Sequence, residues 1–339
     1  MNGRIRSVLT GILIASVSLA LTLGAIEVLL RFDVMPQTVF RPTGIEEVHK
    51  SEPLSPDFRL PVADLKDKGD AFRILVIGDS FAWGDGVYAQ DAFPHRLETR
   101  LNSVSRGDRF EVVNWSRPGW NTRRQVRSLK KGKKLAWLQP DLMILSFVLN
   151  DPEPVSVAER EALLAGTAGH EAAPGLSTWL ADHSRLYELV WNRLENSRTH
   201  RVLRAYYRRL YEGEHWDACL KAIADLKTMS QNHEIPLILV IWPVFDGPMD
   251  DSYEYTDLHG NVSDVAQQLG IPVFDLLDTY RGMDGYRLPV RPYSDAHPNE
   301  LAHRIAADGI LRFLVRKKLV PKTDYQPPGR RKKAKASAS

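Results

Sequence analysis

The sequence has little cysteine and lacks the short signatures of several well-known catalytic and nucleotide-binding sites. Cys219 is the single cysteine among 339 residues, so an internal disulfide and a cysteine-based zinc site are both excluded. No His-Glu-x-x-His segment is present, and Gly78, Gly84 and Gly86 form neither a Walker A loop nor a dinucleotide fingerprint. A Gly-x-Ser-x-Gly elbow and a nucleic-acid-binding module are also missing. We therefore expect no cofactor, no metal and no nucleic-acid partner.

Positive charge is concentrated near the C-terminus. The chain has a formal net charge of +3, and five positive charges come from Arg330, Arg331, Lys332, Lys333 and Lys335. The basic character therefore belongs to a tail, which we place at residues 321–339, and says little about the fold. A solvated, disordered tail is the preferred interpretation, and contact with an anionic polymer or lipid is the alternative.

One long apolar run stands near the N-terminus. Ser7 to Ile26 contains no charged residue, and as a helix it is about 30 Å long, which matches the core of a bilayer. A cleaved signal peptide is the alternative, but its apolar core is usually shorter and no convincing cleavage site follows here. We expect residues 1–30 to be an uncleaved, single-pass membrane anchor. Arg4 and Arg6 then remain in the cytoplasm, which puts the rest of the chain outside.

The segment after the anchor and the body of the chain differ in pattern. Residues 31–70 are repeatedly interrupted by proline and read as a tether. From residue 71 to 320, short apolar runs alternate with helical patterns, which predicts a parallel sheet covered by helices on both faces. The expected strands are Phe72–Ile77, Phe110–Val113, Leu142–Phe147, Leu237–Ile241 and Pro272–Phe274. The expected helices are Phe93–Val104, Thr122–Leu138, Asp257–Leu269 and Asn299–Val315, with a helical insertion at about 153–234.

Polar residues that suit acyl chemistry follow several of these strands. Ser80 follows the first strand in Ile77-Gly78-Asp79-Ser80-Phe81, where a rigid strand end holds a hydroxyl at a crevice. Gly119 and Asn150 come after the second and third strands, and Asp295-Ala296-His297 precedes the last helix. A histidine can take the serine proton at neutral pH, and a nearby carboxylate can orient its ring.

Serine, glycine, asparagine and histidine in this order resemble the SGNH (GDSL-type) hydrolase superfamily over roughly Phe72 to Phe313. The resemblance implies a three-layer α/β/α, flavodoxin-like fold and a serine esterase. It also implies Ser80 as nucleophile, His297 as base and Asp295 as orienting acid. The oxyanion hole would consist of the backbone N–H groups of Ser80 and Gly119 and the side-chain amide of Asn150.

The spacing of the acid departs from the common family pattern. That pattern has the acid three residues before the histidine, where this chain has Ser294, whereas Asp295 lies two before His297. The shorter spacing resembles a variant found in some extracytoplasmic polysaccharide O-acetyltransferases of the superfamily. Because the superfamily that this chain resembles is mostly hydrolytic, hydrolysis of an ester in a small-molecule, lipid or glycan substrate is the first expectation. Acyl transfer to an envelope polysaccharide, or non-catalytic glycan binding by an envelope protein, are the alternatives.

Overall fold

The computed structural model describes residues 3–31, 68–131, 134–168, 184, 201–291 and 295–325. It divides into two compact units, one of Met1–Arg41 with Leu163–Tyr206 and one of Pro42–Ala162 with Tyr207–Ser339. Nearly all of the expected tether, a large part of the expected insertion, most of the basic tail and Ser294 lie outside the described residues.

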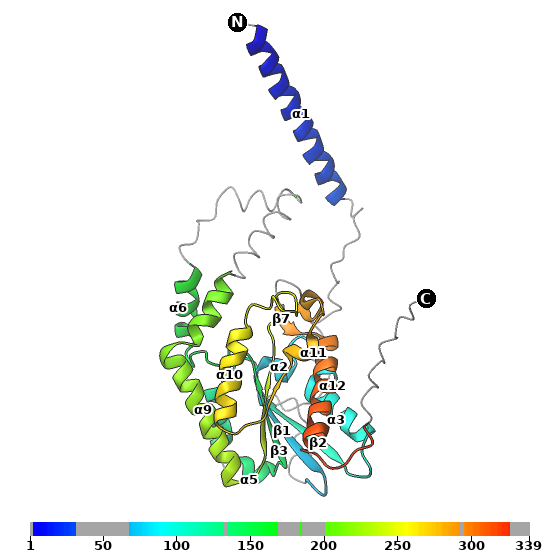
Figure 1. The fold of residues 1–339 in the computed structure, drawn as a ribbon, viewed down its shortest axis with the longest axis vertical. Helices are drawn as coiled ribbons and strands as arrows, with labels where there is room; N and C mark the ends of the chain where they lie inside the picture. The colour runs from blue at the N-terminus through cyan, green and yellow to red at the C-terminus, as the bar shows by residue number, and fades with distance from the viewer. Residues whose placement is uncertain are drawn as a thin grey trace, which may run out of the picture. The chain divides into compact units, whose positions relative to one another are not determined.

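A parallel sheet of five strands forms the centre of the larger unit (Figure 1). The strands are β1 (Phe72–Gly78), β2 (Phe110–Ser116), β3 (Leu142–Phe147), β4 (Leu237–Ile241) and β5 (Val273–Asp275). Their order is β2-β1-β3-β4-β5, so the chain turns to opposite sides of β1 when it forms β2 and β3. Crevices outside the carboxyl ends of strands at such a switch point are where α/β folds bind ligands.

Helices cover the sheet on both faces, and this confirms the expected three-layer α/β/α architecture (Figure 1). The pairs α3 (Phe93–Ser103) with α12 (Glu300–Lys317), and α4 (Thr122–Lys130) with α9 (Gly213–Asn232), pack within the two layers. Further helices among the described residues are α2 (Ser80–Trp83), α5 (Lys134–Leu138), α6 (Val157–Ala168), α10 (Thr256–Gln268) and α11 (Leu277–Tyr280), and residues 201–210 are helical as well. The 3₁₀ turn η2 (Ala89–Asp91) lies between α2 and α3, and the 3₁₀ turn η3 (Gly285–Arg287) follows α11.

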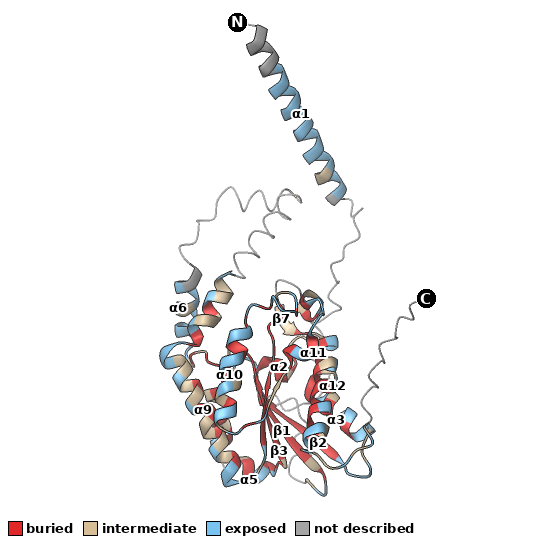
Figure 2. Ribbon diagram, in the orientation of Figure 1, coloured by how far each residue is buried: buried red, intermediate tan, exposed pale blue. Residues whose placement is uncertain are grey.

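The strands are apolar because both of their faces are covered. β3 and β4 are buried along their whole length, and Figure 2 shows burial concentrated in the sheet and on the inner faces of the helices. The helix α9 buries Cys219, Ile223 and Leu226 and packs against α4. This part of the 153–234 segment therefore belongs to a helical layer of the sandwich.

Two elements differ in detail from the sequence pattern. The helix expected over Thr122–Leu138 ends at Lys130, and α5 begins at Lys134. A small antiparallel ribbon of β6 (Pro289–Arg291) and β7 (Asp295–Pro298) lies outside the main sheet. Asn299 joins this ribbon to α12: its Oδ1 accepts from the N–H groups that start α12, and its Nδ2 donates to the carbonyl oxygens of Arg287 and Pro289.

In the smaller unit, α1 (Gly3–Arg31) is a single long helix. Its segment Thr10–Leu29 has a mean hydropathy of 2.2, and it is long and apolar enough to cross a membrane or to be a signal sequence. Large apolar side chains along it are exposed, as the pale blue of α1 in Figure 2 shows. Near its end, Glu27 accepts a hydrogen bond from the Ser184 hydroxyl at 2.9 Å.

Candidate active site

Ser80 lies at the carboxyl end of β1, where the strand passes directly into the short helix α2. The Asp79 carboxylate caps this turn by accepting from the Phe81 N–H at 2.9 Å. Gly78 makes the tight turn possible, because a Cβ there would lie 2.6 Å from the Cβ of Ala82 and 3.1 Å from that of Ser146. The turn therefore holds Ser80 in a fixed position, with only 7% of the residue exposed.

The ribbon brings His297 to Ser80. The His297 Nε2 lies 2.9 Å from the Ser80 Oγ, and the His297 Nδ1 lies 2.6 Å from the Asp295 Oδ1. The same carboxylate oxygen accepts from the His297 backbone N–H at 3.1 Å. Asp295 thus reaches the ring despite its unusual position two residues before the histidine. The three side chains predicted from the sequence lie together in a single hydrogen-bonded row.

Electrostatics within this row favour a basic imidazole. Burial alone lowers the pKa of His297, but the hydrogen bond and charge of Asp295, with the charges of Asp85 and Asp79, raise it above its ordinary value. Burial works in the opposite direction on the pKa of Asp295, and the hydrogen bonds from His297 more than offset it, so that this pKa is lowered. Asp295 therefore remains ionised at neutral pH and stabilises a proton on His297.

An aromatic side chain supports the histidine ring. Phe81 meets the His297 ring edge to face with 5.6 Å between ring centroids, and it meets Trp242 in the same way at 5.8 Å. No role for Phe81 was predicted from the sequence. Its place directly after the proposed nucleophile was the only available signal, because the contact joins segments that are far apart in the chain.

Gly119 lies in an exposed turn at the carboxyl end of β2. The Arg117 N–H donates to the Gly78 carbonyl oxygen at 3.4 Å, so the turn lies against the end of β1. Gly119 has a φ of +72°, a conformation that side chains rarely adopt, and a Cβ at this position would meet nothing within 4 Å. The backbone conformation, rather than crowding inside the protein, therefore accounts for glycine here.

Asn150 lies in the loop that follows β3, and its neighbour Asp151 fastens that loop. The Asp151 carboxylate accepts from the Thr122 hydroxyl at 2.8 Å, the Gln125 amide at 2.9 Å and the Val148 N–H at 2.8 Å. Thr122 and Gln125 belong to α4, which begins just after the Gly119 turn. One carboxylate therefore ties the loop of Asn150 to the segment that follows Gly119.

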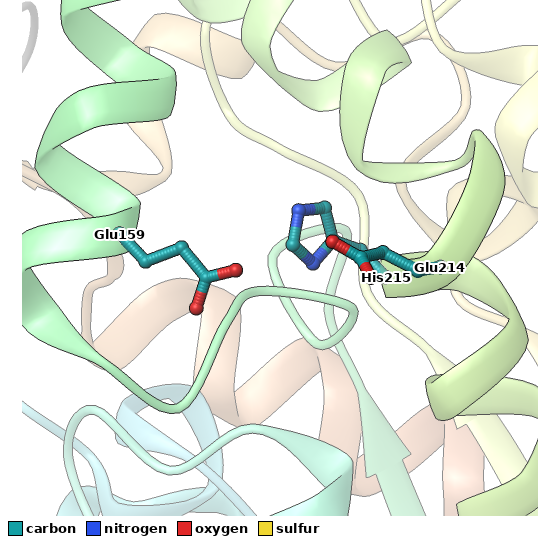
Figure 3. Close-up of side chains that lie close together, drawn as sticks. All are labelled: Glu159, Glu214 and His215. Atoms are coloured by element: carbon teal, nitrogen blue, oxygen red, sulfur yellow. The ribbon is translucent and has the colours of Figure 1, made fainter.

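Two other features lie apart from these residues. Glu159 of α6 faces Glu214 and His215 at the start of α9, and their possible ligand atoms lie within 4.8 Å of one another (Figure 3). Such a group could hold a metal ion, but the two glutamates are exposed and the group contains no residue of the Ser80 site. A cavity of about 500 Å³ beside β5 and α12 is lined by Phe274, Phe313, Tyr325 and their neighbours, and it also excludes that site.

Comparison with known proteins gives one family match. Residues 76–305 match the model of the GDSL-like Lipase/Acylhydrolase family. A search of the curated proteins found no match.

Among solved structures, the chain is similar to TesA at 17% identity and a TM-score of 0.45, covering 73% of this chain and 99% of the other. An acetylxylan esterase, Axe2 from Geobacillus stearothermophilus, is 16% identical with a TM-score of 0.42, covering 72% and 94%. The esterase EstA from Pseudoalteromonas is 13% identical with a TM-score of 0.42, covering 73% and 98%.

Proposed function

The chain belongs to the GDSL-like lipase/acylhydrolase family, and on that premise we propose that it is a serine esterase that works through an acyl-serine intermediate. The observation that carries the proposal is the row of contacts from Ser80 through His297 to Asp295. A serine hydroxyl reacts only when a base removes its proton, and here the base is already within hydrogen-bonding distance.

In the first half of the reaction, the Ser80 Oγ attacks the ester carbonyl carbon while the His297 Nε2 takes the hydroxyl proton. The carbonyl oxygen becomes an oxyanion as the new bond forms. The bond between the carbonyl carbon and the alcohol oxygen then breaks, and His297 returns its proton to the departing alcohol. Asp295 accepts from the Nδ1–H throughout, which fixes the tautomer and stabilises the imidazolium.

Donors aimed at the oxyanion are the second requirement of this reaction. We assign this role to the backbone N–H groups of Ser80 and Gly119 and to the side-chain amide of Asn150. The carboxyl-end position of their loops, after β1, β2 and β3, supports the assignment. These strands are neighbours in the sheet, so the three loops leave it at adjacent positions.

In the second half, an acceptor attacks the acyl-serine, and His297 removes the acceptor's proton. Water as acceptor gives hydrolysis, and this is the function that we propose, with an O-acetyl or other acyl ester as substrate. A sugar hydroxyl of an envelope polysaccharide as acceptor would give acyl transfer. The Asp295-Ala296-His297 spacing is the observation that keeps transfer as a second candidate.

We further propose that α1 is retained as a single-pass anchor, which would hold the catalytic domain on the extracytoplasmic side of the membrane. The apolar span Thr10–Leu29 supports retention in a bilayer. Arg4 and Arg6 before it support the orientation, since cytoplasmic flanks carry the excess of positive residues.

The test uses the full-length protein in detergent, treated with a fluorophosphonate probe that reacts with activated serines. We expect a single adduct on the peptide that contains Ser80, and none in Ser80→Ala. An unlabelled wild-type protein with an intact circular dichroism spectrum would overturn the assignment of Ser80. Products formed from an acetyl ester, with and without a glycan acceptor, then separate hydrolysis from transfer, because only transfer yields an acetylated glycan.

A further inference from the structure

The loop between β4 and α10 is buried although it forms neither helix nor strand. It comprises residues 242–255, and Trp242, Val244, Met249 and Tyr253 are each at most 5% exposed. Loops usually lie at the surface, because their backbone N–H and C=O groups need water or other partners. The conformation of this β4–α10 loop must therefore be held by hydrogen bonds inside the protein.

One end of the β4–α10 loop lies behind the ring of the proposed base. The Trp242 ring meets Phe81 with 5.8 Å between centroids, and Phe81 meets the His297 ring at 5.6 Å. The Trp242 Nε1–H donates to the Ser146 hydroxyl at 3.0 Å, which fixes the indole against β3. A displacement of the loop would therefore reach His297 through two aromatic contacts.

The middle of the same loop holds the segment that leads to the ribbon. The Met249 N–H donates to the Met283 carbonyl oxygen at 3.2 Å, and the Gly282 N–H donates to the Met249 carbonyl oxygen at 2.7 Å. Gly285 lies so close to the loop that a Cβ there would overlap the Gly247 carbonyl oxygen. Gly285 begins η3, and η3 leads into β6, which pairs with the strand β7 of the proposed base. The loop thus supports both the ring and its ribbon.

A buried row of three side chains fastens this loop. The His259 Nδ1 lies 2.9 Å from the Asp275 Oδ2, and the His259 Nε2 lies 3.4 Å from the Tyr253 hydroxyl oxygen. The Val244 N–H donates to that hydroxyl oxygen at 2.8 Å. When the Nδ1–H donates to Asp275, the Nε2 can accept the Tyr253 proton, and the hydroxyl oxygen still accepts from Val244. Since Asp275 belongs to β5 and His259 to α10, the row ties the loop to the sheet and to a helix.

The row has the same order of groups as the proposed catalytic row, namely carboxylate, imidazole and hydroxyl. Its hydroxyl cannot act as a nucleophile on a substrate, because Tyr253 is only 5% exposed and already accepts from a backbone N–H. His259 is only 2% exposed. These three side chains are therefore suited to holding a structure in place and not to chemistry on a substrate.

We propose that Asp275, His259 and Tyr253 are positioning residues for His297, which they hold in reach of Ser80 through the β4–α10 loop. This inference rests on the proposed function, because it assigns a partner to the base of that reaction. It adds a second histidine–carboxylate pair that supports the first from within the protein.

The test removes the link between the row and the loop without creating a large cavity. Tyr253→Phe keeps the ring but loses the hydroxyl that Val244 and His259 share. His259→Asn keeps an amide N–H near the place of the Nδ1, yet its side chain is too short to reach Tyr253. Ser230→Ala is the matched control: it loses a buried hydrogen bond of 2.6 Å to the Ile235 carbonyl oxygen before β4 begins, at the opposite edge of the sheet.

The kinetic measurement uses full-length protein in detergent and an activated acetyl ester. Tyr253→Phe and His259→Asn are each expected to lower kcat by about tenfold to 10²-fold, because a displacement of about 1 Å at a reacting group has effects of this size. KM should change by less than about twofold, since the contacts with the bound ester remain. Ser230→Ala should keep both constants within about twofold, although each of the three variants loses one buried hydrogen bond and some thermal stability.

A spectroscopic measurement separates positioning from activity. In NMR spectra of protein labelled with ¹³C at histidine, the ring protons of His297 lie beside the Phe81 ring and are sensitive to its place. Their signals, assigned with His297→Ala, should move in Tyr253→Phe and His259→Asn and stay in place in Ser230→Ala.

Unchanged kcat in a folded Tyr253→Phe or His259→Asn would overturn the proposal, and so would an equal loss in Ser230→Ala. If one of the two variants does not fold, the other decides. A wild-type protein whose Ser80 is not labelled by the fluorophosphonate would refute the esterase. The His297 signals would then still show whether the row holds this ring in place.

Discussion

His297 Nε2 lies 2.9 Å from Ser80 Oγ, although 217 positions separate the two residues in the chain. Ser80 is held by the main sheet through β1, whereas His297 is held by the ribbon β6–β7. The pair therefore exists only in the folded protein. Catalysis by this pair requires both members at once, and that requirement gives the first prediction.

Removal of either member should abolish ester hydrolysis to the same extent. Ser80→Ala and His297→Ala are each expected to lower kcat by at least about 10³-fold, because nucleophile and base act as a unit. The double variant should be no slower than either single one. Steady-state kinetics with an activated acetyl ester measure this, with thermal unfolding as a control for folding. Multiplying losses in the double variant would show that the two residues act separately.

The pH dependence should reflect the raised pKa of His297. The ring must be neutral to accept the serine proton, so kcat/KM should fall as the pH drops through this pKa, at a midpoint above the ordinary value of about 6.5.

Asp295→Asn removes the hydrogen bond and the charge that raise this pKa. Its acid limb should therefore move to lower pH, while the maximal rate falls by about 10²- to 10⁴-fold. A complete pH–rate profile of both proteins measures the two effects. An acid limb that does not move in the variant would argue against Asp295 as the partner of the ring.

Loss of the Asn150 amide should act on the transition state. Asn150→Ala is expected to lower kcat by about 10²- to 10³-fold with little change in KM, because an oxyanion donor is used mainly after the carbonyl is attacked. Asn150→Asp is the matched variant: it keeps the size of the side chain but replaces the donor by a negative charge, and it should be slower still. Equal rates for wild type and Asn150→Ala would remove Asn150 from the oxyanion hole.

Two glycines should respond differently to alanine. In Gly78→Ala the new Cβ would press on Ala82 and Ser146, and overpacking of this kind typically destabilises a protein by about 1–3 kcal/mol. In Gly119→Ala the Cβ enters open space, and the strain of a positive φ costs about 1–2 kcal/mol. Urea unfolding measures both variants. In Gly119→Ala the exposed turn can relax, so part of the lost stability would be recovered while activity still falls. In Gly78→Ala the surrounding residues are buried and cannot relax in this way, so the loss of stability should remain.

Membrane retention can be tested directly on cells that express the full chain. We expect the protein to stay with the membrane after an alkaline carbonate wash and to be released only by detergent, since Thr10–Leu29 is long enough to span the bilayer. Replacing two central leucines, Leu19 and Leu21, by lysine should release it, because charged residues at the middle of a span are strongly disfavoured. Quantitative release of the wild-type protein by carbonate would exclude the anchor.

Much of the fold could be predicted from the sequence because fully covered strands leave a simple pattern. β3 has the predicted bounds, Leu142–Phe147, and the start of α12 follows from the cap at Asn299. The ribbon β6–β7 could not be predicted in this way. It is too short to show an alternating pattern, its pairing is irregular between Pro289 and Arg291, and its contact with Ser80 through His297 joins segments that are far apart in the chain.

In the candidate site, too, the residues next to strands and helices could be predicted from the sequence, whereas contacts between distant segments could not. Ser80 and Asn150 could be predicted from the sequence because they follow strands, and His297 could be predicted because it precedes a helix. Two features could not be predicted from the sequence. One is the contact of Phe81 with the His297 ring, and the other is the set of hydrogen bonds that Thr122 and Gln125 donate to Asp151. Such contacts depend on packing between segments, and a single sequence carries no direct signal for them.

The attachment of the ribbon β6–β7 implies that the protein can lose activity without losing its overall stability. The Asn299 side chain links the carbonyl groups of η3 and β6 to the first turn of α12, just after the segment that carries His297. Local opening at such a link needs far less free energy than global unfolding. A substitution at Asn299 would then leave the melting temperature of the protein nearly unchanged. It would still abolish activity, because His297 would no longer lie within hydrogen-bonding distance of Ser80.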